Sequence, residues 1–192
     1  MITASIFSND KDKLIIPPLS TFYDKVAQPM AWTILRLAVG GMLVIEGLPK
    51  IMAPFAQVGF VEKLGFYPGW LWSPTLAVMQ VLGGLLIALG LFTRPAALAN
   101  GVMLAITLYF HMANPYGDAF LTQAGIDALK AGSDFFTPQA MARLADSGHV
   151  FLHQVQSKAE LASLFWTGGA FLFAAFGGGY LSLDQLLFKK QF

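Results

Sequence analysis

Long apolar stretches separated by short polar breaks dominate the chain from residue 30 onward. In the clearest case, residues 71–112, two apolar runs flank the break Thr93-Arg94-Pro95. Each run has about the 17–25 residues that a helix needs to cross the hydrocarbon core of a bilayer. Because a segment in lipid must satisfy its backbone hydrogen bonds internally, the pattern predicts transmembrane helices over 71–92 and 95–112, joined by a tight turn.

Two further apolar segments predict two more spans, over residues 30–48 and 159–177. The last of these ends in a run of three glycines, which favours a helix stop. The prediction is therefore an all-α integral membrane four-helix bundle over residues 30–180. A polar N-terminal arm, 1–29, with a short surface helix at 21–28, precedes the bundle, and a C-terminal tail, 181–192, follows it.

The segment between the third and fourth spans, residues 113–157, is long and polar. It contains Thr137-Pro138, in which threonine suits a helix N-cap and proline suits the first helical position. Apolar residues recur after this point with polar residues between them. We therefore expect an extracytoplasmic outer loop that carries one or two amphipathic helices on the membrane surface.

The composition supports a membrane protein and excludes some kinds of cofactor. The chain is 56% hydrophobic and 12% charged, whereas soluble domains carry about 25% charged residues. The lipid bilayer is thus one expected partner, and no basic run indicates a nucleic acid as another. Because the chain has no cysteine, it carries no iron–sulfur cluster or thiol redox centre of its own.

Four spans place both termini on one side of the membrane. The basic residues expected on that side are Lys11, Lys13, Lys25, Arg36, Arg94, Lys189 and Lys190. The basic residues expected on the other side are diluted by acidic ones. Since basic residues are enriched in cytoplasmic segments, the distribution predicts cytoplasmic termini in a bacterial inner membrane.

All three histidines are predicted on the outer side. His149 and His153 are four residues apart, which places them on one face of a helix, and His111 ends the third span. Imidazoles on one face are candidate ligands of a metal or haem, with Asp146 as an orienting acceptor. The alternative is that His149 and His153 form the solvated face of a surface helix and that His111 is an interfacial residue.

A second candidate site, for a proton or a quinone, combines Glu46, Lys50, Tyr109 and His111. A quinone site needs an apolar slot, an aromatic wall and one or two donors to the carbonyl oxygens. An ionisable residue near a span is a functional candidate, and a buried Glu46 would carry protons. The alternative is an ion pair between Glu46 and Lys50 one helical turn later.

Two polar residues are predicted inside the spans. Arg36, in the first span, is interpreted as an anchor whose side chain reaches the nearer surface, or as the partner of a carboxylate elsewhere. Gln80, in the second span, is interpreted as an interhelical hydrogen-bonding residue, with a contact to a ligand as the alternative.

Three stretches resemble one known family. They are RLAVGGMLVIEGLPK at 36–50, QVLGGLLIALGLFTRPAAL at 80–98 and GGGYLSLDQLL at 177–187. In this order they resemble the DoxX family of small four-helix membrane proteins. The chain departs from the family at Gln80, where members often have a carboxylate, at Glu46, where they often have a histidine, and in its long segment 113–157.

The resemblance implies a function that composition alone does not indicate. Some DoxX proteins are subunits of thiosulfate:quinone oxidoreductase. We therefore expect a membrane subunit of a quinone-linked oxidoreductase complex, anchoring other membrane or periplasmic subunits and contributing to a quinone site at the outer membrane face. The alternative is a non-catalytic accessory or assembly subunit of a larger membrane complex.

Overall fold

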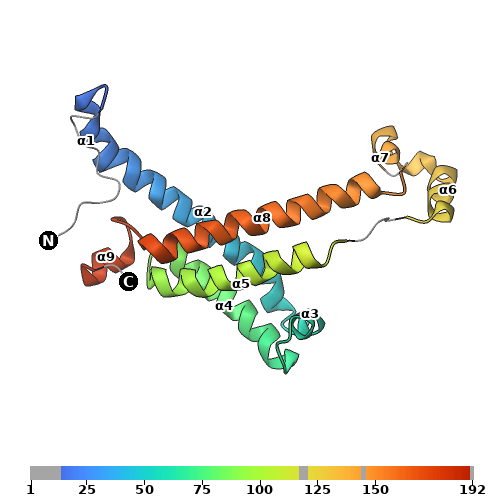
Figure 1. Ribbon diagram of the computed structural model, residues 1–192, viewed down its shortest axis with the longest axis horizontal. Helices are drawn as coiled ribbons and strands as arrows, with labels where there is room; N and C mark the ends of the chain where they lie inside the picture. Colours follow the sequence, from blue (N-terminus) through green and yellow to red (C-terminus); the bar gives the residue numbers. More distant parts are fainter. Residues whose placement is uncertain (1–13, 117–120, 144–145, 191–192) are drawn as a thin grey trace. The chain divides into compact units, whose positions relative to one another are not determined.

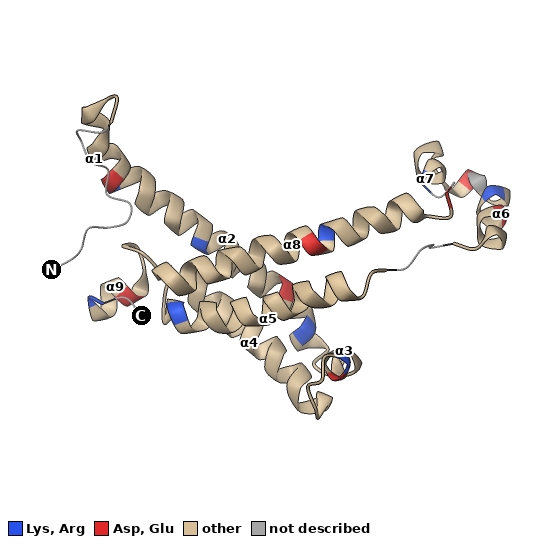
Figure 2. Ribbon diagram, in the orientation of Figure 1, with Lys and Arg blue, Asp and Glu red and all other residues tan. Residues whose placement is uncertain are grey.

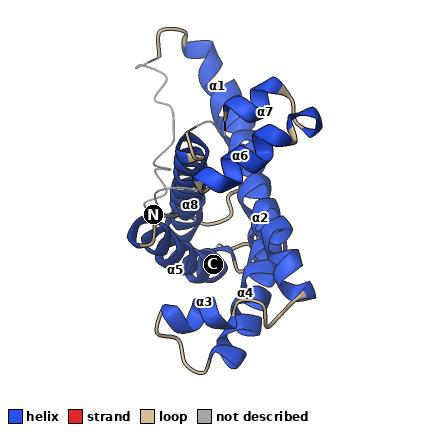
Figure 3. Ribbon diagram, turned by 90° about the vertical axis from the view of Figure 1, so that its right-hand side faces the viewer, coloured by secondary structure: helices blue, strands red, loops and turns tan. Residues whose placement is uncertain are grey.

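The computed structural model describes residues 14–116, 121–143 and 146–190 (Figure 1). Every regular element in these ranges is helical (Figure 3). Among these described residues, four helical stretches are long and apolar enough to cross a membrane: Pro17–Met52, Gly69–Leu89, Thr93–Ala113 and His149–Phe176. The predicted all-α class with four spans is thus confirmed, and charged residues are sparse along the long helices (Figure 2).

The first span begins earlier than the sequence pattern suggested. A 3-10 turn η2 (Pro17–Leu19), α1 (Ser20–Phe22) and a π-helical turn η3 (Tyr23–Ala27) lead without interruption into α2 (Gln28–Met52). The predicted separate surface helix at 21–28 is therefore part of one continuous helix. Pro29 lies just after the π-helical turn, so the helix passes this proline at a point where its geometry changes. The acidic and basic residues at 10–13 lie outside the described residues.

The last span also begins earlier, because α8 runs from His149 to Phe176 rather than from residue 159. No proline or glycine interrupts the chain between Gly148 and Gly168, so the polar residues 149–158 simply continue the helix. The segment that connects α5 (Thr93–Ala113) to α8 is correspondingly shorter than the outer loop expected at 113–157. It contains α6 (Gln123–Ala131), a 3-10 turn η4 (Ser133–Phe135) and α7 (Pro138–Ala142).

The chain divides into two compact units, which we describe separately. The first comprises residues 1–103 and 166–192, and the second comprises residues 104–165. The first unit holds α2, α3 (Val58–Lys63), α4 (Gly69–Leu89), the start of α5, the end of α8 and α9 (Leu183–Phe188). The second holds the end of α5, the helices α6 and α7, and the start of α8.

Glycines let the helices of the first unit approach closely. A methyl group at Gly40 of α2 would lie 2.5 Å from the backbone carbonyl oxygen of Gly84 in α4, so only glycine fits there. In the same way, a methyl group at Gly169 of α8 would lie 2.8 Å from the side chain of Val39. Such small-residue contacts are typical of transmembrane helix packing, and they enclose a core that includes Val39, Ile87, Ala97 and Phe173.

The turn between α4 and α5 is tight because Gly90 ends α4 in the left-handed conformation, with a φ of 72°. Its N–H donates to Ile87, and the N–H of Leu91 donates to Leu86, which satisfies carbonyls at the end of α4. The α5 helix then begins at Thr93, two residues before Pro95. This turn places Gly90 and Thr93 beside Asp184, with which both residues form hydrogen bonds.

The second unit is organised by helix caps and by one glutamine. The hydroxyl of Thr122 caps α6 by accepting from Gly125, and that of Thr137 caps α7 by accepting from Ala140. Gln156 of α8 donates to the carbonyl of His111 at 2.7 Å and accepts from the N–H of Tyr116 at 3.3 Å. That α6 and α7 lie on the membrane surface stays a prediction.

Candidate functional site

A buried polar cluster lies at one end of the first unit, made of Arg36, Thr93, Ser182 and Asp184. These side chains are at most 3% exposed. They come from α2, the start of α5, and the turn and helix that follow α8. Charged groups are rarely buried to this degree without partners, so the bonds of this cluster decide what it can do.

Arg36 directs its guanidinium at backbone carbonyls. Its Nη1 donates to Gly178 at 2.5 Å, its Nη2 to Leu181 at 2.8 Å and its Nε to Ala88 at 3.2 Å. These carbonyls lie at the end of α4 and in the glycine-rich turn after α8, where helix geometry leaves them without intrahelical partners. Arg36 therefore joins three elements, and its interpretation as an anchor that reaches the nearer membrane surface stays a prediction. The first unit satisfies this cation internally.

Asp184 accepts hydrogen bonds from backbone N–H groups, whereas Arg36 donates to backbone carbonyls. Its carboxylate accepts from the N–H of Phe92 at 2.8 Å, and from the N–H and the hydroxyl of Thr93 at 3.2 and 3.1 Å. Its own N–H donates to Gly90 at 2.8 Å. The carboxylate thus binds the beginning of α5, where a negative charge is favoured, and it is near enough to act electrostatically on Arg36.

Gly90 and Gly178 lie against this cluster and leave room for its side chains. A Cβ at Gly178 would lie 2.7 Å from the hydroxyl of Thr93, and a Cβ at Gly90 would lie 2.5 Å from the Arg36 guanidinium. Ser182 completes the turn by donating to Gly179 and accepting from Gln185, which caps α9. The segment predicted as a tail at 181–192 is therefore partly core, since Asp184 is fully buried.

A second polar contact joins α2 to α4, further along these two helices. Lys50 is about 21 Å from Arg36 along α2, at about 1.5 Å per residue. It donates to the side-chain oxygen of Gln80 in α4 at 2.7 Å. The interhelical hydrogen bond predicted for Gln80 is confirmed, and Gln80 is 3% exposed. Glu46, one turn before Lys50, is exposed and acts on Lys50 electrostatically, while the direct hydrogen bond of Lys50 goes to Gln80.

The candidate proton or quinone residues fall in different units. Glu46 and Lys50 belong to the first unit, whereas Tyr109 and His111 belong to the second. Tyr109 is 70% exposed, and the His111 ring lies edge-on to that of Phe110 with centroids 6.2 Å apart. In the second unit His111 contributes its backbone carbonyl to Gln156. The combined site stays a prediction.

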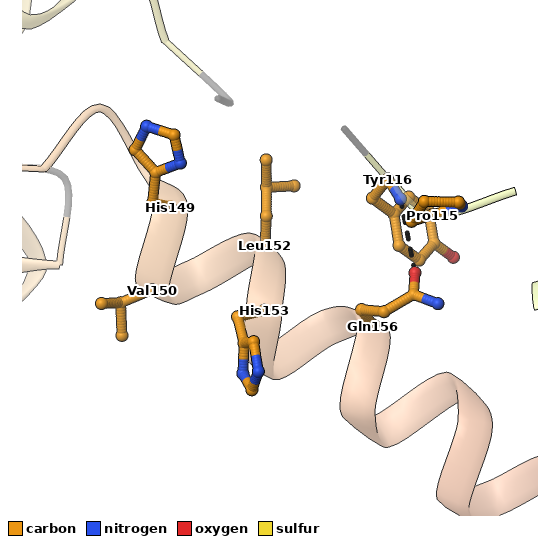
Figure 4. A pocket seen from close by; sticks show the side chains of 7 residues that line it. All are labelled: Pro115, Tyr116, His149, Val150, Leu152, His153 and Gln156. Atoms are coloured by element: carbon orange, nitrogen blue, oxygen red, sulfur yellow. Dashed lines mark hydrogen bonds between the residues drawn. The ribbon is translucent and has the colours of Figure 1, made fainter. Parts of the chain in front are cut away.

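His149 and His153 line a shallow cavity of about 450 Å³ in the second unit (Figure 4). Both side chains are exposed, and Figure 4 shows their rings projecting from the helix in different directions. The other lining residues are Pro115, Tyr116, Val150, Leu152 and Gln156. No group of three or more histidine, aspartate or glutamate side chains with the spacing of a metal site occurs among the residues that the structure describes. The geometry thus gives no support to a metal or haem shared by His111, His149 and His153.

Asp146 has a role other than orienting a histidine. Its carboxylate accepts from the N–H of Val150 at 2.8 Å and from that of Gly148 at 3.1 Å, at the start of α8. The hydrogen bond from Val150 is the main cause that lowers the pKa of Asp146 below its ordinary value, and His149 contributes electrostatically. Asp146 therefore acts as a helix cap.

Sequence reasoning missed Asp184, Thr93 and Ser182. A signal was present, because Asp184 belongs to the Ser-x-Asp pattern after the glycine run and Thr93 begins the break between two spans. It also missed Asn100, a fully buried residue of α5 whose amide donates to Ala96 at 2.9 Å and to Met79 of α4 at 3.4 Å. Asp184, Thr93 and Asn100 bond to distant parts of the chain, whereas the bonds of Ser182 are local.

Comparison with known proteins agrees with the core of this description. The sequence pattern of the DoxX family matches residues 31–112, which include α3, α4 and most of α2 and α5. The chain is also 38% identical over 71 residues to Inner membrane protein YphA of Escherichia coli (strain K12). That match covers 37% of this chain and 51% of the relative, so the chain spans about half of that relative's length. No solved structure matches the chain.

The family match covers the packed pair α2 and α4, including Arg36, Lys50 and Gln80, and stops before the turn that carries Ser182 and Asp184. The four long apolar helices and the similarity to an inner membrane protein together support a multi-pass inner membrane protein. The family resemblance noted in the sequence is thus confirmed for residues 31–112, where this multi-pass membrane protein matches the DoxX family.

Proposed function

We propose that the protein is a membrane subunit of a quinone-linked oxidoreductase complex, in which it anchors a partner subunit at the bilayer. The quinone link rests on the DoxX domain, because the resemblance implies a role of this kind. The anchoring role rests on the structure of the first unit. Its buried charges Arg36 and Asp184 bond to the protein's own backbone and hold α2, α4, α5 and α9 together.

The bonding of this cluster is the observation that carries the anchoring role. A buried arginine with three carbonyl partners and a buried carboxylate with three donors are held in fixed positions. Moving either charge would leave backbone groups unpaired, at a cost of about 1–3 kcal/mol for each group. These residues therefore support a rigid scaffold within the first unit. In the second unit, the capped helices α6 and α7 offer polar surface to a partner.

Copurification from native membranes tests this proposal. A tagged chain is extracted in mild detergent, and the proteins that accompany it are identified by mass spectrometry and quantified. We expect an oxidoreductase subunit in fixed stoichiometry. Deleting the chain should remove quinone-reducing activity from the membranes, and the wild-type chain should restore it. Recovery of the chain alone, together with unchanged membrane activity after its deletion, would contradict the proposal.

A second candidate role is direct contact with the quinone, and one observation favours it. Lys50 donates a hydrogen bond to Gln80 next to the exposed Glu46, so donors and a carboxylate lie together on α2 and α4. The variants Lys50→Met and Glu46→Gln separate the two roles in an assembled complex. Lys63→Met is the matched control, since Lys63 is exposed in the last turn of α3.

Direct contact predicts a raised KM for quinone in Lys50→Met and Glu46→Gln while the subunit stoichiometry stays that of wild type. A purely anchoring role predicts an unchanged KM, with activity that falls only as far as assembly falls. The orientation with cytoplasmic termini belongs to the same proposal. Reporter fusions at the C-terminus that are active only in the cytoplasm or only in the periplasm test it.

A further inference from the structure

A groove of about 510 Å³ opens on the first unit between the first turns of α5 and the last turns of α8. Its lining is apolar except for one cation, and comprises Arg94, Pro95, Leu98, Phe171, Ala174 and Ala175. The groove has the size of a small-molecule site. It lies at the ends of two spans, and the level at which spans end is that of the lipid headgroups.

Side-chain size explains why the groove exists. Ala174 and Ala175 contribute no bulk beyond a methyl group, whereas Leu98 and Phe171 are large and stay 53% and 38% exposed. Phe171 also packs against Gly101, where an added Cβ would lie 3.1 Å from the ring. The ring is thus held against α5, and a long shallow surface remains open beside it.

Arg94 lines this groove with a free charge. It is exposed, and it makes no hydrogen bond or ion pair with any residue in the described part of the chain. The nearby polar cluster adds no net charge, because Arg36 and Asp184 carry opposite charges. Arg94 therefore gives the groove one positive charge beside an otherwise apolar lining.

We propose that this groove binds an anionic phospholipid, with an acyl chain along Leu98, Phe171 and the two alanines and the phosphate paired with Arg94. The lipid matches both halves of the site. Hydrocarbon surrounds an apolar groove between spans, and a guanidinium at the span end presents several N–H donors to phosphate oxygens. Basic residues between spans are a recurrent feature of sites for anionic headgroups.

Native mass spectrometry of the full-length protein in mild detergent tests the proposal. The protein is titrated with phosphatidylglycerol or with phosphatidylcholine carrying the same acyl chains, and the bound fraction is measured for each. One basic residue near the surface gives a preference of about fivefold, so we expect phosphatidylglycerol to bind about fivefold more tightly. Arg94→Gln should bring its affinity to that of phosphatidylcholine.

Two further variants separate the charge from the groove. Arg143→Gln is the matched control, because Arg143 is an exposed arginine outside the groove, and it should keep the fivefold preference. Ala174→Phe fills the groove and should weaken both lipids, provided that its melting temperature stays that of wild type. Arg94→Lys should retain part of the preference, since the charge remains without the planar fork.

The remaining outcomes overturn the proposal. Equal binding of the two lipids by wild type, or an unchanged preference in Arg94→Gln, would show that Arg94 does not select the headgroup. Competition by inorganic phosphate as strong as that by the lipid would identify a free-phosphate site. If Ala174→Phe folds and binds both lipids like wild type, the acyl chain does not occupy the groove.

Discussion

Two arginines in the membrane-spanning helices have opposite surroundings in this protein. Arg36 is 3% exposed and donates to three backbone carbonyls, whereas Arg94 is exposed and has no bonding partner among the described residues. Both residues lie in apolar surroundings in the sequence, Arg36 inside α2 and Arg94 in the first turn of α5. The difference shows that the role of a charge in a membrane protein follows from the backbone groups that it can reach.

The location of uncapped carbonyls explains the contrast. Arg36 points to the end of α4 and to the turn after α8, where backbone carbonyls have no helical partner. Arg94 lies in the first turn of α5, where the free backbone groups are N–H donors that cannot bind a cation. Those donors are instead bound by Asp184. Each charge of the cluster thus binds the helix end of opposite polarity, and Arg94 is left for an external partner.

The largest effect is expected from removing the buried cation. Arg36→Met leaves three carbonyls unbonded and Asp184 without its compensating charge, so we expect a loss of about 3–5 kcal/mol in unfolding free energy. Arg94→Met, the matched control, should change it by less than about 0.5 kcal/mol. Thermal or denaturant unfolding of the purified protein measures both. Similar losses in the two variants would contradict the comparison.

A double-mutant cycle sharpens this result. Asp184→Asn keeps one of the two acceptor oxygens, places an NH2 donor where the other accepted from Phe92 or Thr93, and removes the charge, so we expect a loss of about 1–3 kcal/mol. In the double variant Arg36→Met, Asp184→Asn the losses should fall short of additivity by about 0.5–3 kcal/mol. Strict additivity would show that the two charges act independently. Protection of α9 from proteolysis provides a second readout.

Neighbouring glycines repeat the contrast between buried and open positions on one helix. A methyl group at Gly40 would lie 2.5 Å from backbone atoms of α4, whereas a methyl group at Gly41 would have no neighbour within 4 Å. Gly40→Ala should therefore destabilise the protein by about 1–3 kcal/mol. Gly41→Ala should leave stability unchanged or raise it by up to about 1 kcal/mol, because alanine favours helices. A loss of stability in Gly41→Ala as large as that in Gly40→Ala would contradict this packing.

The smallest effect concerns Asp146, an exposed charge that caps a helix. Its pKa is lowered by the hydrogen bond from Val150, so its stabilisation of α8 is present above the ordinary aspartate pKa of about 3.9. The stabilisation is lost as the pH falls through the lower pKa of the folded state. An NMR titration of the Val150 amide should show a transition below pH 4. The transition should be absent in Asp146→Asn, and its persistence there would assign it to another group.

The sequence predicted some polar contacts correctly and missed others for a physical reason. The hydrogen bond of Gln80 was predictable, because an uncharged polar residue inside a span must find a partner on a neighbouring helix. The cluster around Asp184 was not, since its bonds reach residues more than ninety positions away. The start of α8 at His149 was also missed, because a hydropathy pattern detects the apolar part of a helix and not its polar continuation.

The sequence by itself determined the four spans, the all-helical class and the DoxX resemblance. These depend on runs of adjacent apolar residues, and a transmembrane helix satisfies its backbone hydrogen bonds within its own segment. Only the tertiary structure decided which arginine is buried, since Nη1 of Arg36 binds a carbonyl 142 positions away. It also decided that the segment after α8 belongs to the core and that an open groove lies beside Arg94. The ends of helices find their partners only when the chain has folded, because those partners come from other helices.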